Sequence, residues 1–152
     1  DQDPTGTVNI NNFVAEAHGI FKFQHAELRA LYAQSQINGA NKVSALAGAE
    51  VAVPKTQNGY YVTAAYNLMP VVGSEKFNAL TPFVRFEQLN LQAAMTGDAE
   101  SDASLESTEI TAGLEFKPHA DVVYKLEYST KSNAVKDCNA TQEIRFGAGF
   151  IY

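Results

Sequence analysis

The chain has 152 residues, of which 45% are hydrophobic, and its formal net charge is −6 at pH 7. Its Lys and Arg residues are scattered rather than clustered, which argues against a nucleic-acid-binding surface. No run approaches the roughly 20 apolar residues that a membrane-spanning helix needs, so a helical membrane protein is excluded. The single cysteine, Cys138, has no second cysteine in this chain to pair with, and we expect a loop thiol, or a cysteine whose partner lies outside this chain, without a reactive role.

Segments of about ten residues alternate apolar and polar side chains along the chain, a pattern that predicts β-strands. In chain order the predicted strands are 12–23, 26–36, 59–68, 80–91, 107–117, 121–131 and 141–152. The segment from Asn41 to Val53 has helix formers and small residues, so we expect a short helix inside a loop. Pro82 lacks the N–H that a strand ladder needs, and we expect it near a strand start or at a bulge.

Alternate residues of a strand point to opposite sides of the sheet, so each predicted strand has two faces. Charged side chains are confined to one of these faces. In the last segment, Ile144, Phe146 and Phe150 fall on one face, while Glu143 and Arg145 fall on the other. A soluble antiparallel sheet also alternates in this way. The pattern therefore leaves open a soluble or surface-anchored β-sandwich or lipocalin-like module that binds a ligand or a partner.

Two features of the apolar face favour a transmembrane β-barrel over a sandwich. Small residues such as Ala17 and Ala112 lie among the aromatics, which suits a lipid-facing surface but fills a sandwich core poorly. Aromatic residues also gather at strand ends, with Tyr60 and Tyr61 opening one predicted strand and Tyr152 ending another. Such positions are typical of the aromatic girdles at membrane interfaces.

The connections alternate in length, as a barrel with turns on one side and loops on the other requires. The short ones are Gln24–His25 and Pro118–Ala120, Met69–Ala79 is intermediate, and the long ones are Asn38–Asn58, Gln92–Glu106 and Ser132–Ala140. We expect the shorter turns in the periplasm and the longer loops outside the cell.

An odd number of predicted strands does not close a bacterial barrel, because these barrels have even strand numbers. The start of the chain also lacks the basic and apolar regions of a signal peptide. We therefore expect residues 1–152 to be the C-terminal portion of a single outer-membrane β-barrel domain that lacks its N-terminal strands. The alternative is an eighth strand within Asp1–Asn11, where Thr7 to Ile10 would supply only a stub.

Six stretches resemble, in their order and spacing, the outer-membrane porins related to the phosphate-selective porins O and P. These stretches are Phe13–His18, Ala26–Ala33, Gly59–Tyr66, Leu80–Glu87, Gly113–His119 and Val122–Tyr128. The resemblance covers most of the chain from Phe13 onward, although no single stretch is a catalytic motif. The last strand is similar to the signal that such barrels present to the outer-membrane assembly machinery, with Tyr152 in place of the commoner Phe.

The resemblance implies a transmembrane β-barrel in the lipid of the bacterial outer membrane, without a cofactor and commonly a homotrimer. Small polar or anionic solutes would diffuse through its water-filled lumen. The residues expected to line the pore are Glu16, His18, Lys22, Arg29, Arg85, Glu87, Lys125, Glu127 and Arg145, with Glu27, Glu109, Glu115, Lys117, Lys131 and Glu143 on the same face.

Acids and bases on this face are nearly balanced in number, so the sequence shows no surplus of Arg and Lys that would select anions. Arg29, Arg85 and Arg145 are the preferred solute contacts, because a guanidinium can bind an anion with two parallel hydrogen bonds. The other interpretation of the charged residues is cross-strand pairing that keeps the wall rigid.

Other kinds of site find little support. The three histidines lack the spacing of metal ligands, and we interpret the acidic residues between Asp98 and Glu106 as a solvated loop rather than a cation site. No nucleophile lies near a base, and no glycine-rich phosphate loop occurs, so we expect no enzymatic activity. We expect the segment from Asn41 to Val53 to fold into or over the pore mouth, as loops of related porins do.

Overall fold

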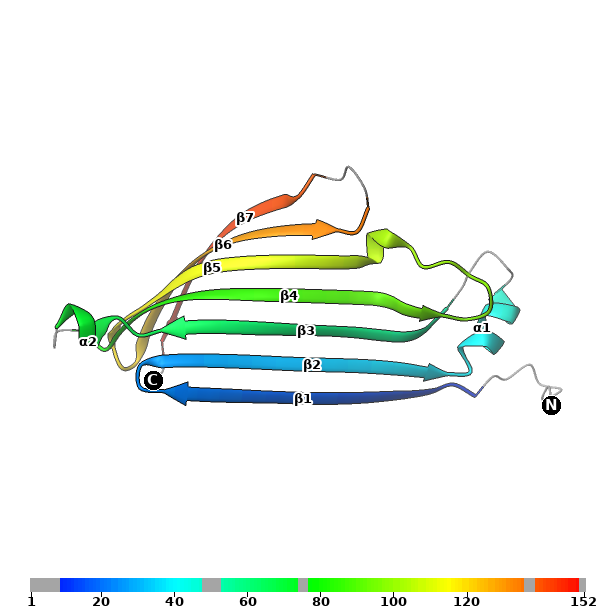
Figure 1. Cartoon of the computed structure of the whole chain (residues 1–152), viewed down its shortest axis with the longest axis horizontal. Helices are drawn as coiled ribbons and strands as arrows, with labels where there is room; N and C mark the ends of the chain where they lie inside the picture. The colour runs from blue at the N-terminus through cyan, green and yellow to red at the C-terminus, as the bar shows by residue number, and fades with distance from the viewer. Residues whose placement is uncertain (1–8, 48–52, 74–76, 136–138, 151–152) are drawn as a thin grey trace.

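The computed structural model describes residues 9–47, 53–73, 77–135 and 139–150 of the chain (Figure 1). Most of these residues lie in strands, because the period-two alternation continues almost without interruption. The elements are β1 (Asn11–Phe23), β2 (Ala26–Asn38), α1 (Ala40–Ala47), β3 (Pro54–Tyr66), α2 (Met69–Val72), β4 (Ala79–Met95), the 3₁₀ turn η1 (Ala103–Leu105), β5 (Glu106–His119), β6 (Val122–Asn133) and β7 (Thr141–Phe150).

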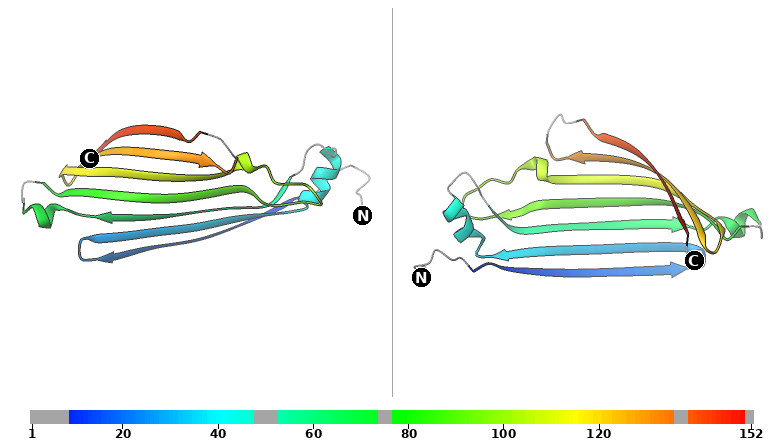
Figure 2. Two further views of the ribbon diagram at one scale, coloured as in Figure 1. Left: turned by 45° about the horizontal axis from the view of Figure 1, so that its top comes forward. Right: turned by 180° about the vertical axis from the view of Figure 1, so that it is seen from behind.

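The strands form one seven-stranded antiparallel sheet in which each strand pairs with the next along the chain, in the order β1 to β7. The prediction of an all-β chain with seven strands is therefore confirmed. The sheet is curved, and β5 to β7 curl away from the plane of β1 to β4 (Figure 2). It is also open, because within the described residues no pairing joins β1 to β7.

Most strands extend a little beyond their predicted ranges, and β3 and β4 extend furthest. β3 begins at Pro54 rather than at residue 59, and β4 continues to Met95 rather than to residue 91. The register between β3 and β4 shifts between Pro54 and Thr56 and again between Thr56 and Asn58, so the ladder continues through residues that do not keep the alternation. Hydrogen bonding to a neighbour thus lengthens strands that the local pattern would end.

Pro82 lies close to the start of β4, as predicted, and is paired opposite Leu114. The predicted helix is present as α1, but it begins at Ala40 and ends at Ala47. Residues 48–52, which the prediction also covered, lie outside the described residues, as do Cys138 and Tyr152. The first half of the proposed N-terminal stub, residues 7–8, also lies outside them, and residues 9–10 are not part of a strand.

The prediction that short and long connections alternate strictly along the chain is wrong. The connection at residues 67–78 lies at the same end of the sheet as the two tight turns, yet it is longer than those at 96–105 and 134–140. It contains the short helix α2, in which Met69 is buried and which ends at Gly73 in a left-handed conformation. We call this the tight-turn end of the sheet and the opposite one the long-loop end.

The register places alternate residues on two faces of the sheet, which we name the apolar face and the polar face. One transverse row of the apolar face consists of Phe21, Leu28, Ala64, Val84, Ala112, Tyr128 and Ile144. The adjacent row of the polar face consists of Ile20, Arg29, Thr63, Arg85, Thr111, Ser129 and Glu143.

The apolar face has no covering layer in the described part of the chain. Among all the described residues, the only buried hydrophobic ones are Ala40, Met69 and Phe83, and none of them lies on the apolar face. On the apolar face, Phe146 and Ile144 are 72% and 75% exposed. None of the described helices is long and apolar enough to cross a membrane. The sheet therefore leaves a continuous apolar surface that its own packing does not use.

Candidate functional site

All nine residues predicted to line a pore lie on the polar face. The register places each of them on the same side of the sheet as Arg29 and Arg85. The structure thus brings these residues onto one surface, and their role in lining a pore stays a prediction.

Most ion pairs on this face join residues two apart on the same strand, since such residues point to the same side about 7 Å apart. Examples are Lys125 with Glu127, at 2.7 Å, and Arg29 with Glu27. Within the described residues, ion pairs between strands are limited to Lys22 with Glu27 and Arg145 with Glu109. The interpretation of the charges as mainly cross-strand pairs is therefore wrong.

Arg145 joins three strands at the curled side of the sheet. Its Nη2 donates hydrogen bonds to Oε1 of Glu109 on β5, at 2.7 Å, and to Oγ of Ser129 on β6, at 2.8 Å. Its Nε donates to Oε2 of Glu143 on β7, at 3.0 Å. Two of the three guanidinium nitrogens of Arg145 thus bind protein oxygens on three strands, which suits a brace between strands better than a solute contact.

Arg85 has a different environment from Arg145. Its Nε donates a hydrogen bond to Oγ1 of Thr63 at 3.1 Å, and its guanidinium carbon lies 5.0 Å from the centre of the Tyr61 ring. In the part of the chain that the structure describes, no carboxylate forms an ion pair with Arg85. Arg29 lies in the same transverse row, with Thr63 between them, and Glu27 contacts it through Nε alone.

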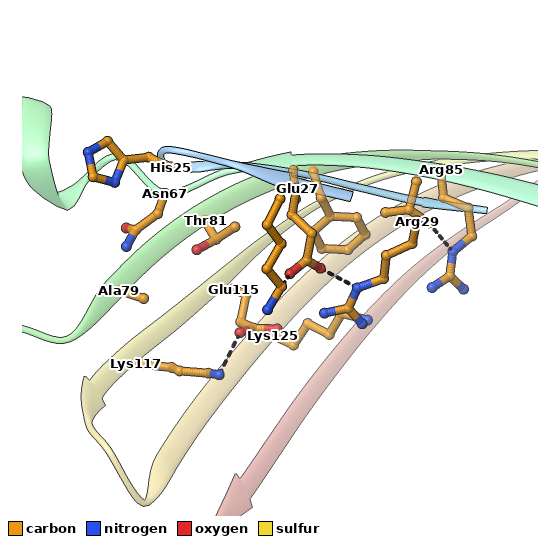
Figure 3. A pocket seen from close by; sticks show the side chains of 14 residues that line it. His25, Glu27, Arg29, Asn67, Ala79, Thr81, Arg85, Glu115, Lys117 and Lys125 are labelled. Carbon is orange, nitrogen blue, oxygen red and sulfur yellow. Dashed lines mark hydrogen bonds and ion pairs between the residues drawn. The ribbon is translucent and has the colours of Figure 1, made fainter. Parts of the chain in front are cut away.

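A pocket of about 320 Å³ opens on the polar face toward the tight-turn end. Arg29 and Arg85 point into it together with Lys117 and Lys125, in the hollow below the curved strands (Figure 3). Its charged lining consists of the cations Lys22, Arg29, Arg85, Lys117 and Lys125 and the carboxylates Glu27 and Glu115. The near balance of charge over the whole face thus does not extend to this pocket, because the register collects cations that lie far apart in the sequence.

A second pocket of about 320 Å³ lies on the same face, toward the long-loop end. Apolar side chains contribute much of its lining, namely those of Leu31, Tyr61, Leu89 and Leu91, none of which the sequence analysis placed among the pore-lining residues. They occupy positions of the polar face where the alternation leads one to expect polar residues. This break in the pattern was the sequence signal that could have indicated the pocket. Gly59 deepens the pocket because it places no side chain beside Leu89.

Phe83 is a buried aromatic residue of the polar face that the sequence analysis did not single out. It is 8% exposed and lies directly over its register partner Gly113, where a Cβ would come within 2.4 Å of the Phe83 ring. Lys125 Nζ lies 4.9 Å from the centre of the same ring, which is cation–π distance. The ring thus shields the bare backbone of a glycine and holds one of the pocket cations in place.

Tyrosines mark the border of the apolar face toward the long-loop end. Tyr32 and Tyr60 are register partners there, and their hydroxyls donate hydrogen bonds of 2.9 Å to Oε1 of Gln34 and Oε1 of Gln88. The expectation that Tyr60 and Tyr61 open their strand is wrong, because β3 begins at Pro54 and the two rings lie on opposite faces.

Helix α1 lies at the long-loop end, beyond the ends of the strands (Figure 1). Ser44 Oγ accepts a hydrogen bond from the N–H of Val53 at 2.9 Å and lies 3.1 Å from Oγ1 of Thr96, which follows β4. These contacts hold α1 at the rim of the sheet. Its expected position in or over a pore mouth stays a prediction.

Two of the acidic residues between Asp98 and Glu106 accept hydrogen bonds. Asp102 Oδ1 accepts from the N–H of Ser104 at 2.8 Å, and Glu106 accepts from the side-chain amides of Gln88 and Asn90. The described residues contain no group of three or more His, Cys, Asp or Glu side chains that could hold a metal ion.

The chain matches no protein-family model, no curated protein and no solved structure. The resemblance to porins of the O and P type accordingly stays a prediction.

Proposed function

We propose that this chain forms part of the wall of an outer-membrane porin that lets small polar or anionic solutes diffuse through a water-filled lumen. The observation that carries the proposal is the separation of the two faces. Large apolar side chains such as Phe21, Phe146 and Ile144 are 65%, 72% and 75% exposed on one side, while the charged residues lie on the other. In a bilayer this arrangement turns the apolar face to lipid and the polar face to water.

The dimensions and borders of the sheet support this proposal. Its strands have 10 to 17 residues, and a tilted strand needs about 9 to 11 to cross a bilayer. Tyr32 and Tyr60 direct their hydroxyls to side-chain amides where the apolar face ends. Tyrosine favours such positions at membrane interfaces because its ring is apolar and its hydroxyl is polar.

The edges of the sheet indicate a larger assembly. β1 has 13 residues, all of them exposed, and pairs on one side only within the described residues. A long exposed edge strand invites pairing with another strand, and closing the sheet into a barrel removes the edge. Further strands between β7 and β1 would complete the barrel and enclose the polar face.

The polar face offers a route for solutes with negative charge. The pocket at the tight-turn end has five cationic side chains against two carboxylates. Arg85 has no carboxylate partner in the described part of the chain, so its terminal nitrogens can exchange water for a passing anion. Arg145 does not share this role, because Glu109 and Glu143 occupy its guanidinium.

The β-sandwich alternative has less support, because a sandwich needs a second layer over the apolar face. The described residues provide none.

Membrane fractionation and conductance of the full-length protein test the proposal. The protein should sediment with outer membranes, require detergent for extraction and open stable channels in planar lipid bilayers. Extraction by low-salt buffer without detergent, or the absence of channels from correctly assembled protein, would overturn the proposal.

A further inference from the structure

The two pockets of the polar face adjoin each other along three strands. Arg29 and Leu31 are two residues apart on β2, Thr63 and Tyr61 on β3, and Arg85 and Glu87 on β4. The first residue of each pair lines the basic pocket and the second lines the apolar pocket. Residues two apart on one strand are separated by about 7 Å. The basic and apolar pockets are therefore neighbouring parts of one surface.

Arg85 connects the two pockets. It lines the basic pocket, and its guanidinium carbon lies 5.0 Å from the ring centre of Tyr61, which lines the apolar pocket. Its Nε is held by Thr63 Oγ1, and Thr63 is itself only 7% exposed. The guanidinium is thus fixed beside an apolar surface, with its terminal nitrogens directed away from Thr63.

We propose that the two pockets together form one solute site for an aromatic carboxylate, an inference that rests on the proposed porin function. The carboxylate binds the terminal nitrogens of Arg85 and Arg29, and the ring lies against Leu31, Tyr61 and Leu89. Both parts of the solute have a matching surface, because guanidinium groups bind carboxylates and apolar side chains remove the ring from water.

Charge also fixes the direction in which the solute lies. Glu87 follows Arg85 on the same face of β4 and lines the apolar pocket. Its carboxylate repels a negative charge placed among Leu31, Tyr61 and Leu89. The negative end of the solute therefore points toward the tight-turn end, and the ring points toward the long-loop end.

A matched set of three probes separates the contributions of ring and charge. The probes are 3-phenylpropionate, propionate, which lacks the ring, and 3-phenylpropan-1-ol, which lacks the charge. The concentration of each that halves the single-channel current is measured with the full-length protein in planar bilayers. Removing about 40 Å² of ring from water accounts for about a fivefold change in affinity, so 3-phenylpropionate should act at a concentration about fivefold lower than propionate, and also lower than the alcohol.

Two variants assign the effect to this site. Leu31→Gln keeps a side chain of similar size but makes the surface polar, and it should raise the half-blocking concentration of 3-phenylpropionate to that of propionate. Val123→Thr changes a residue of the same face that lines neither pocket, and it should leave all three values unchanged. Gel migration with and without heating checks that both variants assemble.

The outcomes distinguish this inference from the porin proposal. Channels that respond equally to 3-phenylpropionate and propionate, or a preference that survives Leu31→Gln, overturn the aromatic carboxylate site and leave the porin standing. Calorimetric titration of the protein in detergent micelles with the same probes measures binding without requiring conductance. Absence of channels together with equal, weak binding of all probes overturns both proposals.

Discussion

Arg145 on β7 reaches across β6 to contact Glu109 on β5, with its Nη2 2.7 Å from Oε1 of the carboxylate. The two residues are 36 positions apart in the sequence. On the way the same nitrogen contacts Ser129 of β6, which is 3% exposed. A single guanidinium therefore ties together the three strands that curl away from the rest of the sheet.

Removing this brace should loosen the curled side of the sheet. We expect Arg145→Ala to lower the urea concentration at the midpoint of unfolding, because Glu109 and Ser129 lose their shared donor. Arg145→Lys keeps the charge but not the planar fork of donors, and it should restore the midpoint only in part. Unfolding in detergent micelles, followed by circular dichroism, measures the effect, and an unchanged midpoint for Arg145→Ala would contradict the bracing role.

The apolar face should reject charge while the polar face accepts it. Phe146→Arg places a cation on the apolar face of β7, and it should cost about 2–4 kcal/mol of stability in a bilayer if the site lies near the midplane. Gly147→Arg is the matched control one residue along, on the polar face, where a Cβ meets nothing within 4 Å. Unfolding titrations in lipid vesicles compare the two.

This pair of variants also distinguishes a membrane protein from a soluble one. In water, Phe146 at 72% exposure would tolerate the change to Arg, since surface substitutions usually alter stability by less than about 0.5 kcal/mol. Equal stability of the two variants would speak against a lipid-facing surface. Thr111 also lies on the polar face, and the alternation alone would suggest that it accepts an arginine. It is only 5% exposed, however, so Gly147 is the better control for Phe146→Arg.

Gly113 should not accept a side chain. A Cβ there would come within 2.4 Å of the Phe83 ring and 2.9 Å of the Leu126 carbonyl oxygen, and the oxygen belongs to backbone that cannot move aside. We expect Gly113→Ala to lower the free energy of unfolding by about 1–3 kcal/mol, as overpacking does. Gly147→Ala, which adds a methyl group in open space, serves as control, and equal unfolding free energies would refute the close packing of Phe83.

The turn η1 should respond to acid through its capping residue. Hydrogen bonds from the backbone N–H and side chain of Ser104 hold the pKa of the Asp102 carboxyl below its ordinary value of 3.8. Because the pKa is lowered in the folded state, the stability that the cap contributes is present above pH 3.8 and is lost as the pH falls through the folded pKa.

Nuclear magnetic resonance can follow this titration. The amide proton signal of Ser104 should shift with a midpoint below pH 3.8, and Asp102→Asn, which has no carboxyl to titrate, should abolish that transition. A midpoint at or above the ordinary value would show that the hydrogen bond does not hold in solution.

The segment around α1 should narrow the pore mouth if it turns inward in the complete barrel. Deletion of residues 42–51 removes Ser44, which contacts Val53 and Thr96 at the rim, but leaves the paired residues of β2 and β3 in place. We expect higher single-channel conductance and weaker ion selectivity without loss of assembly. Unchanged conductance would mean that the segment lies on the outer surface, away from the solute path.

The sequence by itself determined the strands and the identity of their two faces. Alternation is a local property, because successive side chains of any extended segment point to opposite sides, and so Phe146 and Arg145 could be assigned to opposite faces from their positions alone. The tight turn between β1 and β2 and the helix near residue 40 could also be predicted, because the residue types that favour each of them lie within a few positions of one another.

Only the tertiary structure decided which side chains of a face meet. The register brings Arg29, Thr63 and Arg85 into one row and places Phe83 over Gly113, and each of these contacts joins residues from different strands. The local surplus of cations in one pocket and the apolar lining of the other arise in the same way. Pairing between strands depends on hydrogen bonds and curvature across the whole sheet. A period of two excludes a shift of the register by one residue, which would exchange the faces, but it does not distinguish registers that differ by two residues.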